Sequence, residues 1–563
     1  MRFVPSVLPR LLAIVAATAL CGSVVLAQQT LGGITGEVTD ISGGTIPKAT
    51  VTVVDEQTSL TRSARTTDTG VYSIVNLPIG TYTLTFTADG YDVQKTQHIT
   101  VQAQRTATVN ATLKVGQTSV TVEVDAAPLM NAVDTTNGYV LDTAQIESVP
   151  LATGSFTGVA ILSSGVNAEL SGGTGANSGL GNAPIWANGQ RDTSNSFLLN
   201  GVDASNLFNG KSTSQVPSAR VINSTGVSSS TGAGGVIQTL ASIYLSIGNA
   251  IPTPAPETLQ EVRVNASMYD AQQGSTSGAH IDMSTASGTN NYHGTAYFHR
   301  GTDWINAAPF FFNQDADIPE ANKVPQLHRW VLGGNLGGPI IKDKLFAFLS
   351  YQHLHVSDQE IGDTLTDVPV GLNDTNRDAS GLATLANNSF SDINGTTITA
   401  AQVDPIALAL FNSPSLPGEP GKWLIPNDAR KGVAPTVANI FNAFLPGTGR
   451  FNADMAVADL DYNATTKDTL ALKYFYQHDP AIAPYSYSSV PGFSEHLDAG
   501  AQVASITNTL ILKTNLSTTQ TFGFIREKIW GTNEQAFGPD AIPGGSGGPV
   551  SMNQFGSHYF PGV

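Results

Sequence analysis

The chain has 563 residues, a length that predicts several domains because one hydrophobic core rarely extends over so many residues. Lys and Arg total 27 against 44 Asp and Glu, and the resulting net charge of −17 argues against a nucleic-acid partner. Only 13% of the residues are charged while 56 are glycine, a composition that fits neither a helical enzyme nor a charged disordered tail.

The N-terminus has the three parts of a secretory signal peptide. Arg2 and Arg10 precede an apolar run over 11–20, and a small residue, Ala27, precedes Gln28. We therefore expect residues 1–27 to be removed by cleavage between Ala27 and Gln28. A membrane anchor is the alternative, but the run is shorter than the roughly 20 residues that a spanning helix needs. The single cysteine, Cys21, lies in this segment, so an exported mature chain would be stabilised without disulfides.

Residues 28–115 have the pattern of an all-β sandwich. Short runs of Val, Thr, Tyr and Ile are separated by turn residues at a spacing of roughly 8 to 12. In the clearest strand, 81–88, Tyr82, Leu84 and Phe86 alternate with threonines, so one face can enter a core while the other stays hydrated. The pattern predicts about seven strands.

The same segment resembles the carboxypeptidase regulatory-like domain, a transthyretin-like, Ig-like fold related to carbohydrate-binding modules. The resemblance rests on GEVTDISGGTIPKATVTVV (36–54), TTDTGVYSIVNLPIGTYTLTFTADGY (66–91) and VNATLKV (109–115). No histidine is followed three residues later by Glu, so a zinc peptidase site is not expected. Packing in the core or at a sheet edge is the favoured interpretation of Tyr72, Tyr82 and Tyr91, and stacking of exposed rings on a sugar, which the resemblance suggests, is the alternative.

Residues 139–288 combine a short predicted helix at 142–151 with glycine-rich stretches such as 172–181, which form no core by themselves. Two passages, 188–203 (NGQRDTSNSFLLNGVD) and 257–298, resemble the plug of Oar-like TonB-dependent transporters. In this resemblance Gly189 and Arg191 match the family's Gly-x-Arg, and Asn200-Gly201 stands where Asp-Gly is usual. The family pattern further implies that Glu261 and Arg263 lie on a central plug strand, with a solvated strand face as the alternative.

The linker 116–138 contains an extended stretch that no neighbouring strand obviously pairs with. In the TonB-dependent family a segment just before the plug, the TonB box, adds as a strand to a periplasmic energy-coupling protein, which requires only free backbone groups. A last strand of the sandwich would have the same sequence pattern. The candidate residues are Thr118, Ser119, Val120, Thr121, Val122, Glu123, Val124, Asp125 and Ala126.

Residues 289–563 contain segments of about ten residues with the alternation of transmembrane β-strands, and we expect them to form the first part of a barrel. In 469–477 one face is apolar and aromatic, facing lipid, and the other is small or polar, with Phe475 as an exception. Residues 357–465 are expected to form a long extracellular loop. The six predicted strands are 292–300, 328–337, 345–356, 469–477, 500–512 and 514–528. The passage GGPIIKDKLFAFLSYQ (337–352) resembles a strand, a tight periplasmic turn and a strand of the Oar-like transporters.

Six strands fall short of the roughly 22 at which plugged transporters close, and an open sheet would expose unpaired backbone to lipid. We therefore expect this chain to be the N-terminal part of a longer protein.

Three motifs suggest other functions and are interpreted as structural. Ser546 in GGSGGPV lacks the preceding Asp of trypsin-like proteases and an upstream catalytic histidine motif. Asp374-x-Asn376-x-Asp378 begins like a calcium loop but lacks the later Gly and Glu. The histidine pairs of the strands, which are His353 with His355 and His293 with His299, are interpreted as polar groups facing the lumen.

The sequence thus predicts a mainly β outer-membrane protein that takes up an extracellular ligand through a gated plug. The partners expected are a TonB-like periplasmic protein, outer-membrane lipid, and a ligand such as a glycan or chelate; no cofactor, metal or catalytic residue is expected. A structural or adhesive outer-membrane protein is the main alternative, and a secreted hydrolase is a remote one.

Overall fold

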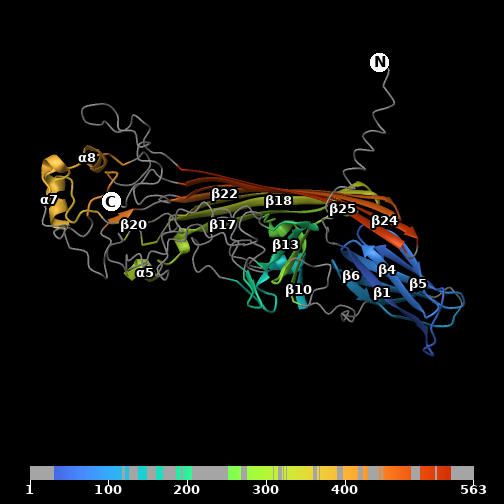
Figure 1. The fold of residues 1–563 in the computed structure, drawn as a ribbon. Helices are drawn as coiled ribbons and strands as arrows, with labels where there is room; N and C mark the ends of the chain where they lie inside the picture. The colour runs from blue at the N-terminus through green and yellow to red at the C-terminus, as the bar shows by residue number, and fades with distance from the viewer. Residues whose placement is uncertain are drawn as a thin grey trace, which may run out of the picture.

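The computed structural model contains three β-rich parts (Figure 1). The described residues are 31–116, 121–125, 137–148, 160–168, 185–191, 194–205, 252–267, 276–308, 310–314, 320, 323–324, 326–358, 364–366, 368–389, 397–415, 422–428, 443–445, 448–483, 495–513 and 516–533. The predicted signal peptide with Ala27 and Gln28, the glycine-rich stretch 172–181 and Ser546 lie outside them. Among the described residues, no helix combines the length and the apolar character needed to cross a membrane.

The first part, the sandwich, packs two sheets around one core. One sheet has the order β4-β1-β7, with β8 also on β1, and the other has the order β3-β2-β5-β6-β9. Tyr82, Leu84 and Phe86 are fully buried, as the alternation predicted. The strands are β1 (Gly32–Asp40), β2 (Thr50–Asp55), β3 (Thr61–Arg65), β4 (Val71–Leu77), β5 (Gly80–Thr87), β6 (Val93–Val101), β7 (Thr106–Thr108), β8 (Ala111–Leu113) and β9 (Thr121–Asp125).

The tyrosines implied as a sugar-stacking surface belong to the sandwich interior. Tyr72 is 1% exposed and its hydroxyl donates to Val109 O at 2.7 Å, while Tyr82 is 0% exposed and donates to Pro78 O at 2.8 Å. Tyr91 is partly buried against the same core. The favoured interpretation, packing in the core, is therefore confirmed, and the two buried hydroxyls are satisfied by backbone carbonyls.

Half of the candidate TonB box pairs with the sandwich. β9 runs parallel to the edge strand β6, from Thr121 beside Val93 to Asp125 beside Gln97. Residues 121–125 therefore have the pairing of the alternative that the sequence left open, a last strand of the sandwich. Thr118, Ser119, Val120 and Ala126 lie outside the described residues.

The second part, the middle sheet, has the strand order β10-β15-β16-β13-β14. The buried faces of β13, β15 and β16 form a core together with side chains of the third part, so this sheet depends on support from outside. Its elements are β10 (Asn137–Asp142), α2 (Thr143–Ser148), β13 (Ser196–Leu199), β14 (Val202–Asp203), η3 (Pro256–Thr258), β15 (Leu259–Ser267) and β16 (His280–Thr285), with a nearby hairpin of β11 (Val166–Ala168) and β12 (Ile185–Ala187).

The third part, the long sheet, has seven antiparallel strands in the order β17-β18-β19-β22-β23-β24-β25. A tight turn at 342–344 joins β18 to β19, as GGPIIKDKLFAFLSYQ predicted, and Asp343 there has a positive φ of 64°. The strands are β17 (His293–Thr302), β18 (Leu327–Ile341), β19 (Leu345–Asp358), β22 (Gly449–Thr465), β23 (Asp468–Ala483), β24 (Glu495–Lys513) and β25 (Leu516–Asn533).

The predicted loop 357–465 is too long at both ends, because β19 continues to Asp358 and all of β22 lies inside that range. β22 is the strand missed from the sequence. Its inner face is apolar at first but ends in the buried Asp459, and its outer face carries Asn452 and Asp454, so the alternation is weak.

The two faces of the long sheet differ as expected for β23. Phe475, the exception in the pattern, is 1% exposed and packs on the core of the middle sheet with Phe348, Val457 and Val503. An apolar residue is therefore required on the inner face where the middle sheet lies. The prediction that His353 and His355 face the lumen is wrong, because they alternate with Gln352 and Leu354, which are buried on the inner face.

The loop domain, comprising the described residues between β19 and β22, lies at the end of the long sheet far from the sandwich (Figure 1). It has its own core, which includes Leu372, Leu410 and Leu424. Its elements are β20 (Thr364–Thr366), α7 (Ala379–Ser389), η7 (Ala400–Gln402), α8 (Pro405–Phe411) and β21 (Ala443–Leu445); α5 (Phe310–Gln314) and η5 (Asp303–Ile305) lie between β17 and β18.

Candidate functional site

A cluster of buried charges lies on the two adjacent strands β15 and β16. Glu261 is 4% exposed, Arg263 1% and Asp282 2%. Arg263 is directly opposite Asp282 in the antiparallel register, and its Nε donates to Asn265 Oδ1 at 3.1 Å. Because charged groups are seldom buried without a partner, this gate cluster of Glu261, Arg263 and Asp282 is a candidate site.

The sandwich covers the gate cluster through the short connection between β6 and β7. The backbone N–H of Ala103 donates to Glu261 Oε2 at 3.4 Å, and Arg263 Nη1 donates to the carbonyl of the same residue. Gln104, which has a positive φ of 55°, donates from Nε2 to Asp282 Oδ2 at 2.8 Å. Three contacts therefore join residues of the sandwich that are adjacent in sequence to the three charged groups.

Burial determines the protonation of the gate cluster. Desolvation raises the pKa of Glu261 to about 7, with the Ala103 N–H, Arg263 and Arg105 opposing the rise and Asp282 adding to it. Desolvation also raises the pKa of Asp282 to about 7, against the attraction of Arg263. Both carboxyls thus titrate near neutrality, where a small change in their exposure alters their charge.

A second polar network fastens the middle sheet to the long sheet. Lys473 Nζ of β23 lies 3.0 Å from Asp459 Oδ2 of β22 and 3.2 Å from the carbonyl oxygen of Thr285. Thr285 Oγ1 donates to Asp459 Oδ2 at 2.5 Å, and the Thr285 N–H donates to Asn200 Oδ1 at 3.0 Å. This network, the latch, lets a buried ion pair hold the last residue of β16.

Asn200 and Gly201 form the turn between β13 and β14. Their φ values, 53° and 77°, lie in the left-handed region, as a tight hairpin turn requires. The side chain of Asn200 is buried and accepts hydrogen bonds from Thr285, so the residue in place of the usual Asp contributes to the latch without adding a charge beside Asp459.

Gly189 and Arg191 lie elsewhere, in an exposed turn after β12 where Gly189 has a φ of 76°. The contacts of the gate cluster and of the latch described above involve neither residue. The structure thus brings together Glu261 with Arg263, and Asn200 with the latch, but not the Gly-x-Arg pair.

A cavity of about 140 Å³ lies where the sandwich, the middle sheet and the long sheet meet. Asp55 and Pro78 of the sandwich, Thr285 of β16 and Lys473 of β23 are among its lining residues. The lining is formed by all three parts, so a displacement of any one of them would change its shape.

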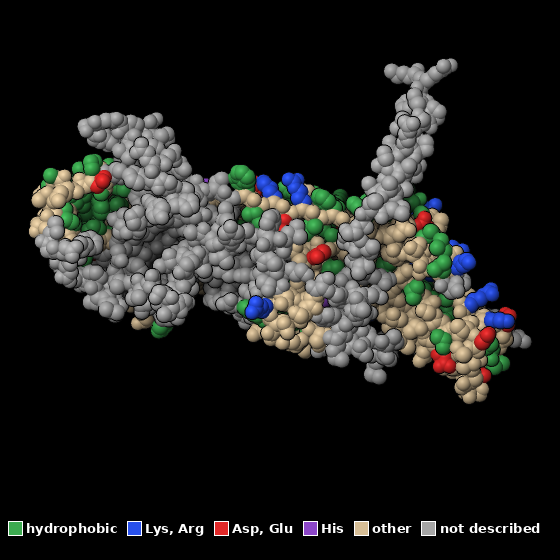
Figure 2. Space-filling model, viewed as in Figure 1, with side chains coloured by type: hydrophobic (Ala, Val, Ile, Leu, Met, Phe, Trp, Pro, Cys, Tyr) green, Lys and Arg blue, Asp and Glu red, His purple; other side chains and the backbone are tan. Residues whose placement is uncertain are grey.

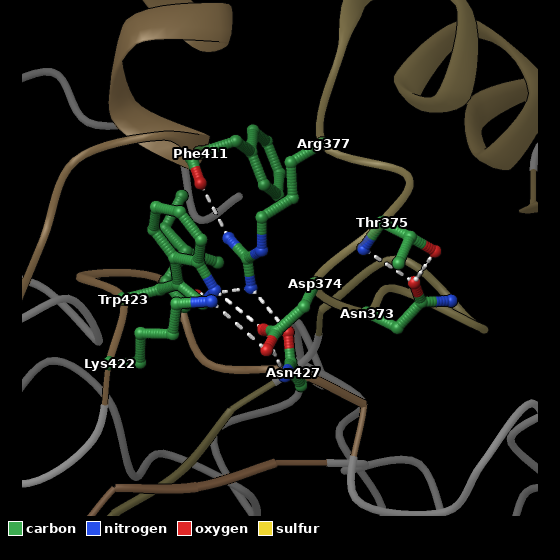
Figure 3. Close-up of polar contacts among 9 residues, drawn as sticks. Asn373, Asp374, Thr375, Arg377, Phe411, Lys422, Trp423 and Asn427 are labelled. Carbon is green, nitrogen blue, oxygen red and sulfur yellow. Dashed lines mark hydrogen bonds and ion pairs between the residues drawn. The ribbon is translucent and has the colours of Figure 1, made fainter.

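The loop domain is held by one charged cluster (Figure 3). Arg377 is 2% exposed, lies with its guanidinium 4.9 Å from the Trp423 ring centroid, and donates to the carbonyls of Phe411 at 2.5 Å and Ile425 at 2.9 Å. Asp374 accepts from Trp423 Nε1 at 2.6 Å, and hydrogen bonds from Asn427, Trp423 and Lys422 lower the pKa of that carboxyl to about 2.

The same contacts explain the partial calcium motif. The oxygens of Asp374 accept from side-chain donors, Asn376 Oδ1 accepts from the Asn373 N–H, and Asp378 Oδ1 accepts from the Gly381 N–H at the start of α7. Turn and helix-start geometry therefore accounts for the spacing of these residues.

Two parts of the chain, the sandwich and the region that contains the long sheet, match families of known proteins. Residues 33–114 match the carboxypeptidase regulatory-like domain, and residues 284–562 match the outer membrane beta barrel domain. These matches place the chain in the outer membrane and show that its second half resembles an outer membrane beta barrel domain. The chain is 27% identical over 371 residues to the TonB-dependent transporter Oar of Myxococcus xanthus. The matched region covers 63% of this chain and 30% of Oar, so the chain spans about a third of the length of this relative.

Solved structures with a similar arrangement include the outer membrane transporter YddB from Escherichia coli, with 12% identity, a TM-score of 0.40, and coverage of 71% of this chain and 39% of that chain. The siderophore receptor PirA from Acinetobacter baumannii is similar at 14% identity and a TM-score of 0.32, covering 72% of this chain and 46% of that chain. The resemblance to Oar-like TonB-dependent transporters and the outer-membrane location predicted from the sequence are confirmed.

Two functional contacts were missed from the sequence. The Ala103–Gln104 connection gave no signal, since its backbone N–H, backbone carbonyl and amide side chain are ordinary groups. Lys473 could have been recognised from the sequence, because it is a lone cation on a strand face otherwise assigned to small and polar residues.

Proposed function

We propose that the chain is the plug-bearing part of a TonB-dependent transporter, in which the middle sheet is the plug and residues 118–126 are the coupling segment. The observation that carries this proposal is the gate cluster, buried on the plug and capped by the sandwich. A plug that moves needs contacts that are specific when closed yet can be exchanged for water, and titratable groups near neutrality meet that need.

The strand pairing supports a route by which force could reach the plug. β9 pairs with β6, and β6 leads directly into the Ala103–Gln104 connection that contacts Glu261, Arg263 and Asp282. In the order β3-β2-β5-β6-β9, β9 is the last strand, so its outer edge can accept a further strand. A periplasmic TonB-like protein that adds to β9 and pulls would act on the gate cluster through β6.

The coupling role of β9 depends on its backbone hydrogen-bonding groups, so the test removes one of them. In the complete protein, Val122→Pro removes an N–H from β9 and should abolish cross-linking to a TonB-like C-terminal domain, whereas Val122→Thr should leave it intact. Equal cross-linking of both variants would refute the role of β9. Deletion of 118–126 should abolish energy-dependent uptake of a labelled oligosaccharide or ferric chelate that the parent takes up.

A structural or adhesive role is the main alternative. An adhesin would keep its surface binding after deletion of 118–126, and uptake unchanged by that deletion would exclude TonB-driven transport. For the hydrolase alternative, Ser546→Ala would remove most of any hydrolytic activity if Ser546 were the nucleophile.

A further inference from the structure

The sandwich and the middle sheet are attached to the long sheet in different ways. The middle sheet shares one buried apolar core with it, to which the long sheet contributes Phe348, Val457, Phe475 and Val503. The core of the sandwich contains residues of the sandwich alone, and among the described residues no buried apolar cluster joins it to another part. The sandwich therefore docks through polar contacts, and interfaces of this kind between domains permit relative motion.

One of these contacts is centred on Asn290, in the connection between β16 and β17. Its backbone N–H donates to Gln57 O of the sandwich at 2.9 Å, and its Nδ2 donates to Ser59 Oγ at 3.2 Å. The same side chain exchanges hydrogen bonds of 2.7 Å and 2.8 Å with Asp343, in the short turn between β18 and β19. Asn290 thus joins the sandwich to that turn, and we call this contact the first seat.

A second seat joins the sandwich to the start of β25. Asn76 Nδ2 donates to Ser517 Oγ at 2.9 Å, and Ser517 is the second residue of β25, beside the short turn from β24. In the sheet order β19 and β25 are four strand spacings apart, which is roughly 19 Å at about 4.8 Å per spacing. The two seats therefore hold the sandwich at two separate places, at the end of the long sheet opposite the loop domain (Figure 1).

The cavity of about 140 Å³ adjoins both seats. On the sandwich side, Thr58 and Leu60 line it next to the first seat, and Pro78 and Ile79 line it close to the second. The opposite side includes hydroxyl groups of β23 and β24, which belong to Thr469, Ser505, Thr507 and Thr509. The sandwich therefore forms one boundary of a polar cavity that reaches the middle sheet at Thr285.

The attachments of the sandwich are the weaker ones. Both seats consist of neutral amide, hydroxyl and backbone groups, and a hydrogen bond of this kind shifts an equilibrium only about fivefold because water can replace it. The gate cluster adds contacts to charged groups, which water can hydrate again once the sandwich leaves. The middle sheet is held by the shared core and by the buried pair of Lys473 with Asp459, whose disruption is far more costly. The sandwich should therefore separate before the middle sheet does.

The sandwich can separate as a folded unit. It encloses a core of its own, in which Ile34, Leu84 and Phe86 are fully buried. On the face that Figure 2 shows, hydrophobic side chains of the sandwich alternate with charged and other polar ones, as suits a surface in water. Residues 126–136 connect β9 to β10, and a connection of that length can span up to about 36 Å. Separation therefore need not displace the middle sheet.

We propose that the sandwich is a detachable lid, which leaves both seats as a folded unit and exposes the cavity while the middle sheet stays on the long sheet. The short turns of outer-membrane barrels face the periplasm, so the lid lies on that side. A role of the lid at the exit for a ligand rests on the proposed transport function, whereas the detachment does not. The experiment therefore measures detachment directly.

The test follows the rate at which a water-soluble maleimide labels single introduced cysteines in the complete protein in detergent, read from the labelled peptide by mass spectrometry. Thr509→Cys is the lid site, because Thr509 is 3% exposed and lines the cavity. Val503→Cys is the core site, because Val503 is 2% exposed and belongs to the core shared with the middle sheet. Lys467→Cys, exposed in the turn between β22 and β23, gives the rate of an open site.

The seat variant combines Asn290→Ala with Ser517→Ala and so removes the side-chain hydrogen bonds of both seats. At about fivefold for each seat, labelling of the lid site should become about 25-fold faster, because its rate follows the detached population. The core site should stay as slow as in the parent. The matched control combines Asn291→Ala with Thr518→Ala, neighbours whose side chains make no hydrogen bond to the sandwich within the described part of the chain, and should label like the parent.

An unchanged rate at the lid site of the seat variant would overturn the proposal, as would an equal acceleration in the matched control. Equal acceleration at the lid and core sites would also overturn it, because the middle sheet would then leave together with the sandwich. If the seat variant does not fold, Ser517→Ala alone should give about a fivefold rise at the lid site, and no rise would refute the lid. Labelling as expected in a protein that takes up neither a labelled oligosaccharide nor a ferric chelate would support the lid and count against transport alone.

Discussion

Raising the pH should loosen the contact between the sandwich and the middle sheet, and Glu261→Gln should remove much of that pH dependence. Burial raises the pKa of Glu261 from 4.5 to about 7 while Ala103, Arg263, Arg105 and Asp282 surround it. When the sandwich moves away and the carboxyl meets water, its pKa falls back toward 4.5. Between pH 4.5 and pH 7, Glu261 is therefore more often protonated when the sandwich is docked than when it has moved away, and undocking releases the proton.

The sign and size follow from linkage. The contribution of Glu261 to closure is fully present below about pH 4.5, declines as the pH rises, and is lost above about pH 7. Between pH 5.5 and pH 7 the change is at most about 2 kcal/mol, or roughly 30-fold in the ratio of closed to open molecules. Asp282, whose pKa is also raised to about 7, acts in the same direction and should account for what remains in the Glu261→Gln variant.

The assay is a distance measurement between spin labels in the complete protein in detergent, at Asp89→Cys on the sandwich and Lys467→Cys on the long sheet, both exposed. The parent should shift toward longer or broader distances between pH 5.5 and pH 8, the Glu261→Gln variant less so, and the exposed Asp68→Asn control as much as the parent. The same pH response in Glu261→Gln as in the parent would refute the assignment.

Three further substitutions test the interior. Phe475→Ala should destabilise the folded protein by about 3 to 5 kcal/mol in denaturant unfolding, because it opens a cavity between the middle sheet and the long sheet. The outward-facing Tyr476→Ala should cost much less, and equal losses would contradict the assignment of the two faces. Lys473→Met should cost about 3 to 5 kcal/mol by leaving Asp459 buried without its cation, and adding Asp459→Asn should restore much of this, which the same unfolding assay can measure. Tyr72→Phe should lower the melting temperature through loss of about 1 kcal/mol from its hydrogen bond to Val109 O, and no change would show that the bond contributes nothing.

The predictable parts of this fold are those where one face meets water or lipid and the other a core. Tyr82, Leu84 and Phe86 alternate cleanly, and their strand was predicted almost to the residue. The turn at 342–344 was equally clear, because two strongly patterned strands flank it. In these places local pattern and tertiary surroundings agree.

The parts that could not be predicted depend on surfaces that the local sequence does not describe. The inner face of β22 meets the core of the middle sheet and then the latch, so it changes from Met455 and Val457 to Asp459 and loses its apolar period. His353 and His355 were assigned to the lumen because they are polar, but on the outer face each imidazole has a polar partner across the strand pair, Asp454 and Asn452 of β22. Glu261 and Arg263 were implied by resemblance, whereas Asp282 and the contacts with the sandwich were not, because they depend on the pairing of β16 and on the docked sandwich.

The pairing of β19 with β22 has an evolutionary consequence. The two strands match residue by residue from Leu345 beside Tyr462 to Asp358 beside Gly449, although residues 359–448 intervene and carry a separate hydrophobic core. The entropy of closing such a connection grows only with the logarithm of its length. We therefore expect insertions and deletions in the loop domain to leave the register of β19 and β22, and the sheet that they belong to, intact.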